Sequence, residues 1–428
     1  MNVHLKTLGC RLNEAELEMW AHDFQKAGHH ITQELTDAQL IIINSCAVTN
    51  DAAKKSRHLI RKLHRENPLA KLVVSGCYAT LNTDEVKAIL GVDMVIGNQE
   101  KPHLVQKILN ELSLTSMPLM AAEPDETSLF TRGRQRAFVK VQDGCRYRCT
   151  FCIVTIARGE ESSRPIQDIV DEVNQLHQQG ITEVVLTGVH LGGYGSDLNT
   201  QLTKLISTLL TDTTIPRIRL GSLEPWEFTE DFFALFAHPR LMPHLHLPLQ
   251  SGSDSVLRRM ARRCKTDEFA NIVKRIRSTH PYFNITTDII VGFPGETEQE
   301  WQESIEFIQK IGFGHIHIFS YSAREGTKAE SLPNHVSHDL KKQRSEALHR
   351  LAQHMKQQFY RANIGQCYPI LWEAQTAMHA TQKLAFGYTP NYLRVQCAID
   401  PTENLANQIL TAELIAVTED KLEAKIQA

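Results

Sequence analysis

The sequence predicts an α/β protein in which two helix-covered parallel sheets precede a small antiparallel β-barrel. Its 428 residues exceed what one hydrophobic core usually serves, so several domains are expected. Short apolar runs alternate with helical patterns as far as residue 361, which is typical of parallel sheets. Beyond that point only strand-like runs remain, separated by turn residues. We therefore expect domains at residues 1–114, 130–361 and 363–428.

Three cysteines follow strands of the first domain at equivalent positions. The expected strands are Val3–Leu8, Leu40–Asn44, Lys71–Ser75 and Met94–Ile96, and the expected helices are Glu14–Ala27, Ala52–Glu66 and Thr83–Leu90. Cys10, Cys46 and Cys77 each lie two residues past one of these strands. One such thiol alone would favour a buried core position. Because the carboxyl ends of parallel strands meet at one sheet edge, the three together are predicted to be metal ligands.

The second domain, which follows a proline-containing linker at residues 115–128, contains six strand–helix units. Its expected strands are Ala137–Gln142, Glu183–Thr187, Arg217–Gly221, Leu245–Leu249, Thr286–Val291 and His315–Tyr321. Helical patterns separate them, including Ile166–Gln179, Leu198–Thr211, Asp267–Ser278 and Glu298–Ile311. This repetition predicts an open, barrel-like α/β domain whose active site lies at the carboxyl ends of the strands.

The third domain shows strand patterns only. They cover Tyr368–Trp372, Lys383–Gly387, Leu393–Ala398 and Gln408–Val417. A small antiparallel barrel is the expected architecture. Such barrels often bind nucleic acid, but the pattern equally fits a structural or docking role. Tyr388 and Tyr392 would stack on bases in the first case and pack the barrel in the second.

The composition excludes several classes of protein. Hydrophobic residues make up 42% and charged residues 22% of the chain, which is ordinary for a globular protein and not for a disordered one. No apolar run reaches the roughly 18 residues of a membrane span, and the N-terminus lacks the pattern of a signal peptide. We therefore expect a soluble, cytoplasmic protein with no membrane partner. Its nine cysteines are an odd number, which favours metal ligands or catalytic thiols over complete disulfide pairing.

The strongest chemical signal is a C-x-x-x-C-x-x-C loop after the first strand of the second domain. Cys145, Cys149 and Cys152 are spaced to ligate three irons of a [4Fe–4S] cluster, for which thiolates are the usual ligands. A structural zinc site would normally need a fourth protein ligand, and none lies within this loop. The fourth iron would then be open to a small molecule.

This loop, placed in a six-fold α/β domain, resembles the radical S-adenosylmethionine superfamily. The resemblance implies a partial (β/α)6 barrel. It also implies that the open iron binds the amino and carboxylate groups of S-adenosylmethionine, which is cleaved reductively to a 5′-deoxyadenosyl radical. Cys145, Cys149 and Cys152 would thus serve catalysis. Four residues after the strands are candidates for holding S-adenosylmethionine: Gly188, Glu224, Gln250 and Arg262. Each of them also fits a purely structural role.

Further strings resemble the methylthiotransferases of that superfamily. Thr7–Asn13, Asn44–Thr49 and Ser75–Tyr78 are similar to their flavodoxin-like N-terminal domain, in which three cysteines carry a second [4Fe–4S] cluster. The last domain resembles the RNA-binding barrel called TRAM. Gly9–Asn13, Thr49–Arg57, Gly97–Lys101, Ser222–Trp226 and Gly387–Tyr392 are similar to the branch that acts on threonylcarbamoyladenosine.

That branch adds a methylthio group to C2 of threonylcarbamoyladenosine beside the tRNA anticodon. The resemblance therefore implies two [4Fe–4S] clusters, S-adenosylmethionine, a tRNA substrate, a sulfur donor and an electron donor such as flavodoxin or ferredoxin. Within the family, the isopentenyladenosine and ribosomal-protein branches remain alternatives. A different class of function is a non-catalytic RNA-binding protein with structural or redox-sensing clusters.

A basic helix is the predicted RNA contact. The stretch from residue 54 to residue 65 contains no acidic residue, although the net charge of the whole chain is −3. Lys54, Arg57, Arg61 and Arg65 share one face at helical spacing, and phosphates attract such a face. A plain solvated helix surface is the alternative interpretation.

Overall fold

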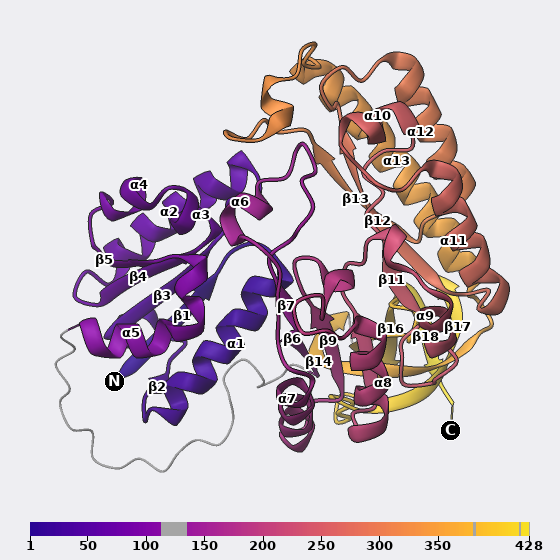
Figure 1. Cartoon of the computed structure of the whole chain (residues 1–428). Helices are drawn as coiled ribbons and strands as arrows, with labels where there is room; N and C mark the ends of the chain where they lie inside the picture. Colours follow the sequence, from indigo (N-terminus) through magenta and orange to yellow (C-terminus); the bar gives the residue numbers. More distant parts are fainter. Residues whose placement is uncertain (113–134, 380–381, 419–420, 428) are drawn as a thin grey trace.

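The computed structural model describes residues 1–112, 135–379, 382–418 and 421–427. They form an N-terminal domain, a central domain and a C-terminal barrel (Figure 1). The predicted linker at residues 115–128 lies outside the described residues. Among the helices of the described part, none combines the length and hydropathy needed to cross a bilayer.

The N-terminal domain is a five-stranded parallel sheet in the order β2-β1-β3-β4-β5. The strands are β1 (Asn2–Thr7), β2 (His30–Ile31), β3 (Leu40–Ser45), β4 (Lys71–Gly76) and β5 (Val92–Ile96). The helices are α1 (Arg11–Lys26), η1 (Leu35–Asp37), α2 (Asn50–Glu66), α3 (Cys77–Leu81), α4 (Thr83–Lys87), η2 (Asn98–His103) and α5 (Leu104–Glu111).

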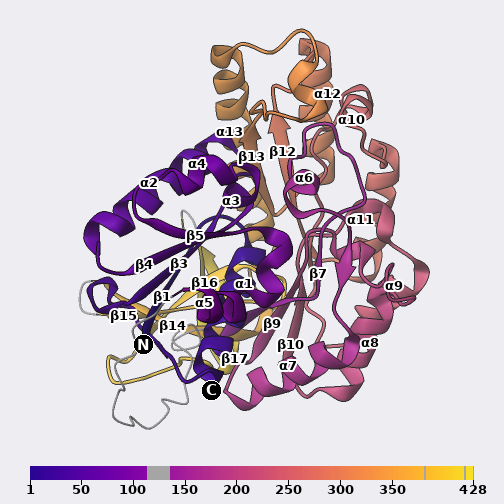
Figure 2. The same ribbon diagram turned by 60° about the vertical axis from the view of Figure 1, so that its left-hand side comes forward.

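Alternating residues of this sheet face two separate cores. Ile41 and Ile43 pack with α2, α3 and α4, whereas Leu40 and Ile42 pack with α1 and α5. The sheet is thus covered on both faces, as predicted (Figure 2). The predicted helix at Thr83–Leu90 was wrong in its bounds, because a first helix already begins at Cys77, directly after β4, and a second ends at Lys87.

The central domain is an open arc of six parallel strands in chain order. They are β6 (Arg136–Lys140), β9 (Glu183–Thr187), β10 (Arg217–Leu220), β11 (His244–His246), β12 (Asn284–Val291) and β13 (His315–Ser320). Isolated bridges, such as that between Ser222 and His246, join its two three-stranded halves. The strand β7 (Gln142–Asp143) pairs with β8 (Ser162–Ser163) beside it. The predicted partial barrel is confirmed.

Helices cover the outside of this arc (Figure 2). They are α7 (Ile166–Gln178), α8 (Leu202–Asp212), α9 (Glu230–Leu235), α10 (Asp254–Arg259), α11 (Thr266–Thr279), α12 (Glu298–Ile311) and α13 (His338–Ala362). The connecting loops contain η3 (Leu191–Gly193), η4 (Pro225–Glu227) and η5 (Lys328–Ser331), and α6 (Val154–Arg158) packs against α3 of the N-terminal domain. Outward residues of the strands, such as Val184, Ile218 and Ile316, pack in one core with these helices. Because strand side chains alternate, the residues between them face the interior of the arc.

The C-terminal domain is a closed five-stranded barrel in the order β14-β15-β16-β18-β17. Its strands are β14 (Cys367–His379), β15 (Gln382–Tyr388), β16 (Arg394–Ile399), β17 (Ile409–Val417) and β18 (Leu422–Ile426). The small barrel is confirmed, but the sequence interpretation missed β18. The ladder that closes the barrel, between β16 and β18, is parallel, whereas the other ladders are antiparallel.

The barrel docks on the base of the central domain. Arg219 stacks on the ring of Tyr392 at 4.4 Å, and Arg136 stacks on Tyr388 at 4.9 Å. Arg219 and Arg136 also pair with the fully buried Glu183. The two tyrosines therefore pack an interface between domains, which favours the structural of the two roles considered for them.

Candidate metal centres and active site

The three cysteines of the central loop lie close together beyond the end of β6. Tight turns hold this loop: Gly144 has a φ of 70°, and a Cβ there would lie 1.8 Å from the Glu160 carbonyl oxygen. Burial, together with the charges of Cys152 and Cys149, raises the pKa of Cys145 to about 12. Burial likewise raises the pKa of Cys149 and of Cys152. A bound iron would displace the thiol protons, because thiolates are the ligating form.

An arginine–glutamate pair borders this cysteine loop. Arg262 donates to both carboxylate oxygens of Glu224, at 3.0 and 2.5 Å, and its Nη1 lies 3.8 Å from Cys149 Sγ. The guanidinium also lies over the Trp226 ring at 4.7 Å. The structure thus brings two of the predicted cofactor-binding residues, Glu224 and Arg262, together beside a cluster cysteine. The guanidinium of Arg262 is therefore already paired with a carboxylate of the protein, that of Glu224.

The other two predicted cofactor-binding residues shape the backbone. Gln250 follows β11, is buried, and adopts a φ of 76°, which is rare for a residue with a side chain. Its backbone nitrogen donates to Asp288 O at 2.9 Å. Gly188 lies against Gln142, whose Oε1 would be 2.8 Å from a Cβ at that position. The absence of a side chain at Gly188 therefore makes room for the side chain of Gln142.

A histidine that was not among the predicted site residues lies beside Cys145. His190 Nδ1 lies 2.6 Å from Glu161 Oε1, and its Nε2 lies 3.1 Å from Glu227 Oε1. Burial opposes its charge, but these two hydrogen bonds raise the pKa of His190. Cys145, Glu161 and His190 have ligand atoms close enough to hold a metal. Because both nitrogens of His190 already have carboxylate partners, we assign it to fixing the loop. Its position just after β9, where active-site residues of such domains lie, was the sequence feature that could have identified it.

The N-terminal cysteines also converge, although they come from three separate strand ends. A Cβ on Gly9 would lie 2.7 Å from Cys46 Sγ, so the loop that carries Cys10 rests directly on Cys46. Gly76, with a φ of 99°, brings Cys77 beside the end of β3. Burial raises the pKa of Cys46, and the charges of Cys10 and Cys77 raise it further. Cys46 and Cys77 directly follow their strands, because β3 and β4 run one residue further than predicted.

A network of buried charged side chains lies beside this triad. Glu16 pairs with Lys101 at 2.5 Å, with Arg158 at 2.9 Å and with Lys140 at 3.0 Å. Arg158 also pairs with Asp143 at 3.0 Å. Three cations thus face two carboxylates, which leaves one positive charge in excess. The charge of Cys77 acts on both Lys101 and Arg158. A cluster ligated by thiolates is anionic, so this excess suits one.

The short helix α6 connects the two triads. It begins two residues after Cys152, and its last residue, Arg158, belongs to the network beside Cys77. The side-chain amide of Asn98 donates a hydrogen bond to the backbone carbonyl of Ala157 at 2.7 Å. The same Asn98 nitrogen lies 3.7 Å from Cys77 Sγ. Five helical residues span only about 7.5 Å. Both triads therefore lie at the interface between the N-terminal and central domains, where α6 packs beside α3 (Figure 1).

The predicted basic helix is α2, and it starts near Cys46. Lys54, Arg61 and Arg65 are exposed. Arg57 is only partly exposed and pairs with Glu85 at 2.7 Å. The basic face thus exists as predicted, but one of its four members is engaged by a neighbouring carboxylate.

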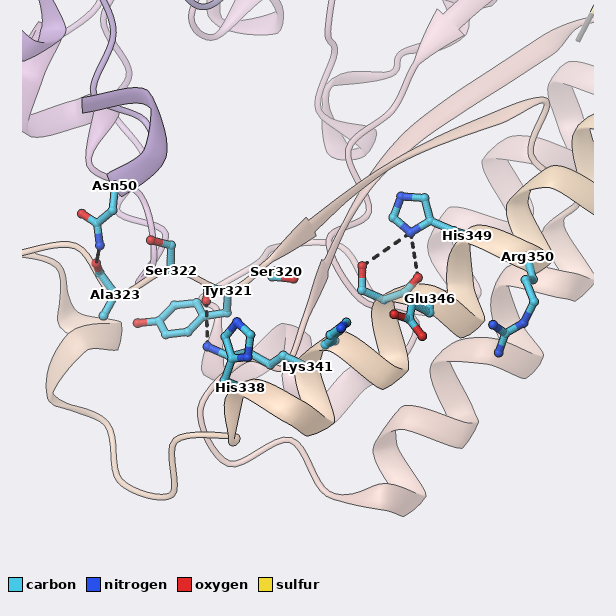
Figure 3. A pocket seen from close by; sticks show the side chains of 12 residues that line it. Asn50, Ser320, Tyr321, Ser322, Ala323, His338, Lys341, Glu346, His349 and Arg350 are labelled. Atoms are coloured by element: carbon cyan, nitrogen blue, oxygen red, sulfur yellow. Dashed lines mark hydrogen bonds between the residues drawn. The ribbon is translucent and has the colours of Figure 1, made fainter. Parts of the chain in front are cut away.

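A polar cleft of about 800 Å³ begins at the first residue of α2. Figure 3 shows Asn50 donating to the carbonyl of Ala323 on one side, and Lys341, His349 and Arg350 of α13 on the other. Lys342 and His338 complete its basic lining, with Glu346 as an acidic member. Sequence reasoning missed this surface, because its cations are interspersed with acids and become one wall only when α13 packs along β13.

Two family models match parts of the chain. One, described as "Uncharacterized protein family UPF0004", matches residues 2–97, and one described as "Radical SAM superfamily" matches residues 139–308. The chain is also 36% identical, over 399 residues, to a Thermotoga maritima protein named threonylcarbamoyladenosine tRNA methylthiotransferase MtaB; the match covers 92% of this chain and 90% of that protein. The chain belongs to the radical SAM methylthiotransferase family.

Other members of this family and more distant structures also match. A Staphylococcus aureus protein named tRNA-2-methylthio-N(6)-dimethylallyladenosine synthase is 32% identical over 401 residues, which cover 90% of this chain and 77% of that protein. The solved radical S-adenosylmethionine methyltransferase TsrM from Kitasatospora setae superposes with a TM-score of 0.57 at 14% identity, over 77% of each chain. The latter likeness shows the fold alone.

Membership of the radical SAM family implies a [4Fe–4S] cluster and S-adenosylmethionine. The donor set of the central loop fits this cofactor. Three thiols of one loop follow β6, near enough for the charges of Cys149 and Cys152 to act on Cys145, and the bordering polar groups, Arg262 and Glu224, are paired with each other. Thiolates are the common protein ligands of such clusters.

Proposed function

We propose that this protein adds a methylthio group to C2 of threonylcarbamoyladenosine, next to the anticodon of tRNA. The observation that carries the proposal is the convergence of six cysteines, as two triads, on one interface between domains. The similarity to relatives of that name and the sequence strings of the first domain support the choice of substrate. A protein that only binds RNA would have no need of two facing triads.

In this proposal each triad has its own task. Cys145, Cys149 and Cys152 hold the cluster that binds S-adenosylmethionine, and Cys10, Cys46 and Cys77 hold a second [4Fe–4S] cluster. When bound, the first cluster and its ligand supply the radical chemistry that an unactivated ring carbon requires. The residues of this chain orient the partners: Arg262 and Glu224 border Cys149, while Gly188 and Gln250 shape the backbone at the strand ends.

The remaining expectations belong to the same proposal. The domain limits are 1–114, 130–361 and 363–428, and the working place of the enzyme is the cytoplasm. An electron donor such as flavodoxin or ferredoxin and a sulfur donor are the required partners. Lys54, Arg57, Arg61 and Arg65 on α2 contact the RNA backbone, together with the basic wall of the neighbouring cleft (Figure 3). The carboxyl-terminal barrel provides a further RNA contact.

Nucleoside mass spectrometry of tRNA tests the proposal directly. A strain that lacks the gene should accumulate threonylcarbamoyladenosine and lose its 2-methylthio derivative. Restoring the intact gene should return the derivative, whereas a copy carrying Cys145→Ala should not. Unchanged methylthiolated threonylcarbamoyladenosine, combined with loss of methylthiolated isopentenyladenosine, would place the protein in the isopentenyladenosine branch.

A further inference from the structure

A group of polar side chains occupies the interior of the central arc below the strand ends. His246 on β11, Asp288 on β12 and His317 on β13 lie on adjacent strands. They face inward, because the residues that alternate with them, such as Leu245, Ile289 and Ile316, pack outward in the core with the helices. His246 and Asp288 are partly exposed and His317 is exposed, so all three are accessible. None of them takes part in the cysteine sites.

Contacts with neighbouring polar groups orient two of these side chains. His246 Nε2 lies within ion-pair distance of Asp288 Oδ1, at 3.2 Å, and His246 Nδ1 forms a hydrogen bond with the Thr286 hydroxyl at 2.9 Å. The buried His244 Nε2 donates in turn to the Thr286 oxygen at 3.3 Å. Both nitrogens of His246 are therefore used, and the Asp288 carboxylate is held in place. Among the described residues, the second oxygen of Asp288 and the ring nitrogens of His317 have no hydrogen-bond partner.

This polar group lies on the side of the arc that faces the N-terminal cysteines. Arg11 directly follows Cys10 and lies over the ring of Phe138 on β6 at 4.9 Å. Burial lowers the pKa of His317, and the charge of Arg11 acts in the same direction, whereas the carboxylate of Asp288 acts in the opposite direction. The imidazole of His317 is thus neutral near pH 7 and keeps one N–H to donate. Arg11 supplies a positive charge nearby.

Two substituents on the adenosine N6 would meet this surface very differently. A threonylcarbamoyl group carries urea N–H donors, a hydroxyl and a carboxylate, whereas a dimethylallyl group is a hydrocarbon. Covering a carboxylate and an imidazole with a hydrocarbon leaves their polar atoms without partners, which is strongly unfavourable. A site built to hydrogen-bond its substrate rejects analogues that lack the partner groups.

We propose that Asp288 and His317 select the threonylcarbamoyl group, an inference that rests on the proposed function. Asp288 accepts a hydrogen bond from the urea, and His317 donates one to the carboxylate, with Arg11 supplying the positive charge beside it. His246 is a positioning residue that holds Asp288. The ligand atoms of His246, Asp288 and His317 all lie within 4.8 Å of one another, so a bound divalent metal is the competing use of the same residues.

The test measures the binding of synthetic anticodon hairpins to the full-length, cluster-reconstituted protein by fluorescence anisotropy. Three hairpins differ only at the target base, which is adenosine, threonylcarbamoyladenosine or isopentenyladenosine. The wild type should bind the threonylcarbamoyl hairpin most tightly. Asp288→Asn and His317→Leu should each reduce this preference about ten-fold, as the loss of one hydrogen bond to a charged group does. Binding of the unmodified hairpin should not change.

The controls separate the possible outcomes. His103→Leu, at an exposed position of η2 in the N-terminal domain, should leave all three affinities unchanged, and melting temperatures should show that the variants fold. A wild type that prefers the isopentenyl hairpin would overturn both the proposed function and this inference. A wild type with the expected preference, retained in both variants, would overturn the inference alone. Elemental analysis that finds one non-iron divalent metal per chain, absent from Asp288→Asn, would also overturn it.

Discussion

The two cysteine triads reach similar arrangements by opposite routes. In the central domain, Cys145, Cys149 and Cys152 lie on a single loop, so local turns alone bring them together. In the N-terminal domain, Cys10, Cys46 and Cys77 come from three strand ends and meet only when the sheet has formed. The first triad borders the Arg262–Glu224 pair and His190 with its two carboxylate partners, whereas the second rests on a five-member buried network. The loop triad is therefore locally determined, and the sheet triad depends on the packing of two domains.

The strongest test of this difference is removal of each triad. Two [4Fe–4S] clusters correspond to about eight irons per chain. Replacing Cys145, Cys149 and Cys152 with Ala should halve the iron measured after anaerobic reconstitution and abolish cleavage of S-adenosylmethionine. The complementary triple variant of Cys10, Cys46 and Cys77 should also halve the iron. Wild-type protein that never exceeds about four irons would exclude a second cluster.

Single substitutions should then separate the chemical roles of the triads. Cys149→Ala should prevent formation of 5′-deoxyadenosine, because the cluster that binds S-adenosylmethionine is lost. Cys46→Ala should leave that cleavage measurable and eliminate the methylthiolated nucleoside. Chromatography of both products from one reaction checks this, with Cys397→Ala, a buried barrel cysteine far from both triads in the sequence, as control. Methylthiolated product from Cys46→Ala would refute the role assigned to the N-terminal triad.

A third prediction concerns the buried network beside the N-terminal triad. Glu16→Gln would remove the carboxylate that pairs with the buried Lys101 and leave Arg158 and Lys140 paired with Asp143. Breaking a buried ion pair costs about 3–5 kcal/mol, so the free energy of unfolding should fall by about that amount. Glu160→Gln is the matched control, because its pair with Arg148 is exposed and should contribute at most about 1 kcal/mol. Denaturant titration of both variants measures the difference.

The same network predicts a dependence on pH. Burial alone would raise the pKa of Glu16, but the charges of Lys101, Arg158 and Lys140 hold it well below its usual range. A depressed carboxyl pKa stabilises the fold above the unfolded value of about 4.3. This contribution is lost as the pH falls toward the folded pKa. The stability difference between wild type and Glu16→Gln should therefore shrink below about pH 4, and a difference independent of pH would contradict the assignment.

The contrast between the triads also explains what the sequence alone could reveal. The loop spacing of Cys145–Cys152 is visible in eight consecutive residues, and the strand-end positions of Cys10, Cys46 and Cys77 followed from the predicted sheet. Glu16 and Lys101 could not be recognised, because an acid in a helix and a lysine in a turn look solvent-exposed until two domains bury them. The grouping of His246, Asp288 and His317 could not be predicted for a similar reason. It depends on how β11, β12 and β13 pair, and the sequence patterns did not give the register of these strands.

The smallest expected effect concerns the RNA contacts, where the structure sharpens the choice of residues. Arg57 already pairs with Glu85, so its loss should weaken RNA binding less than the loss of exposed Lys54 or Arg61. Each lost phosphate contact lowers the salt slope of binding by roughly 0.7–0.9. Lys54→Ala combined with Arg61→Ala should therefore reduce the slope by about 1.5, while cleavage of S-adenosylmethionine without RNA stays unchanged.

The control is a double variant, Lys204→Ala with Lys274→Ala, on the outer helices α8 and α11, and it should leave the salt slope unchanged. Equal slopes for both double variants in a salt titration would assign α2 to ordinary solvated surface and transfer the RNA contact to the wall formed by α13.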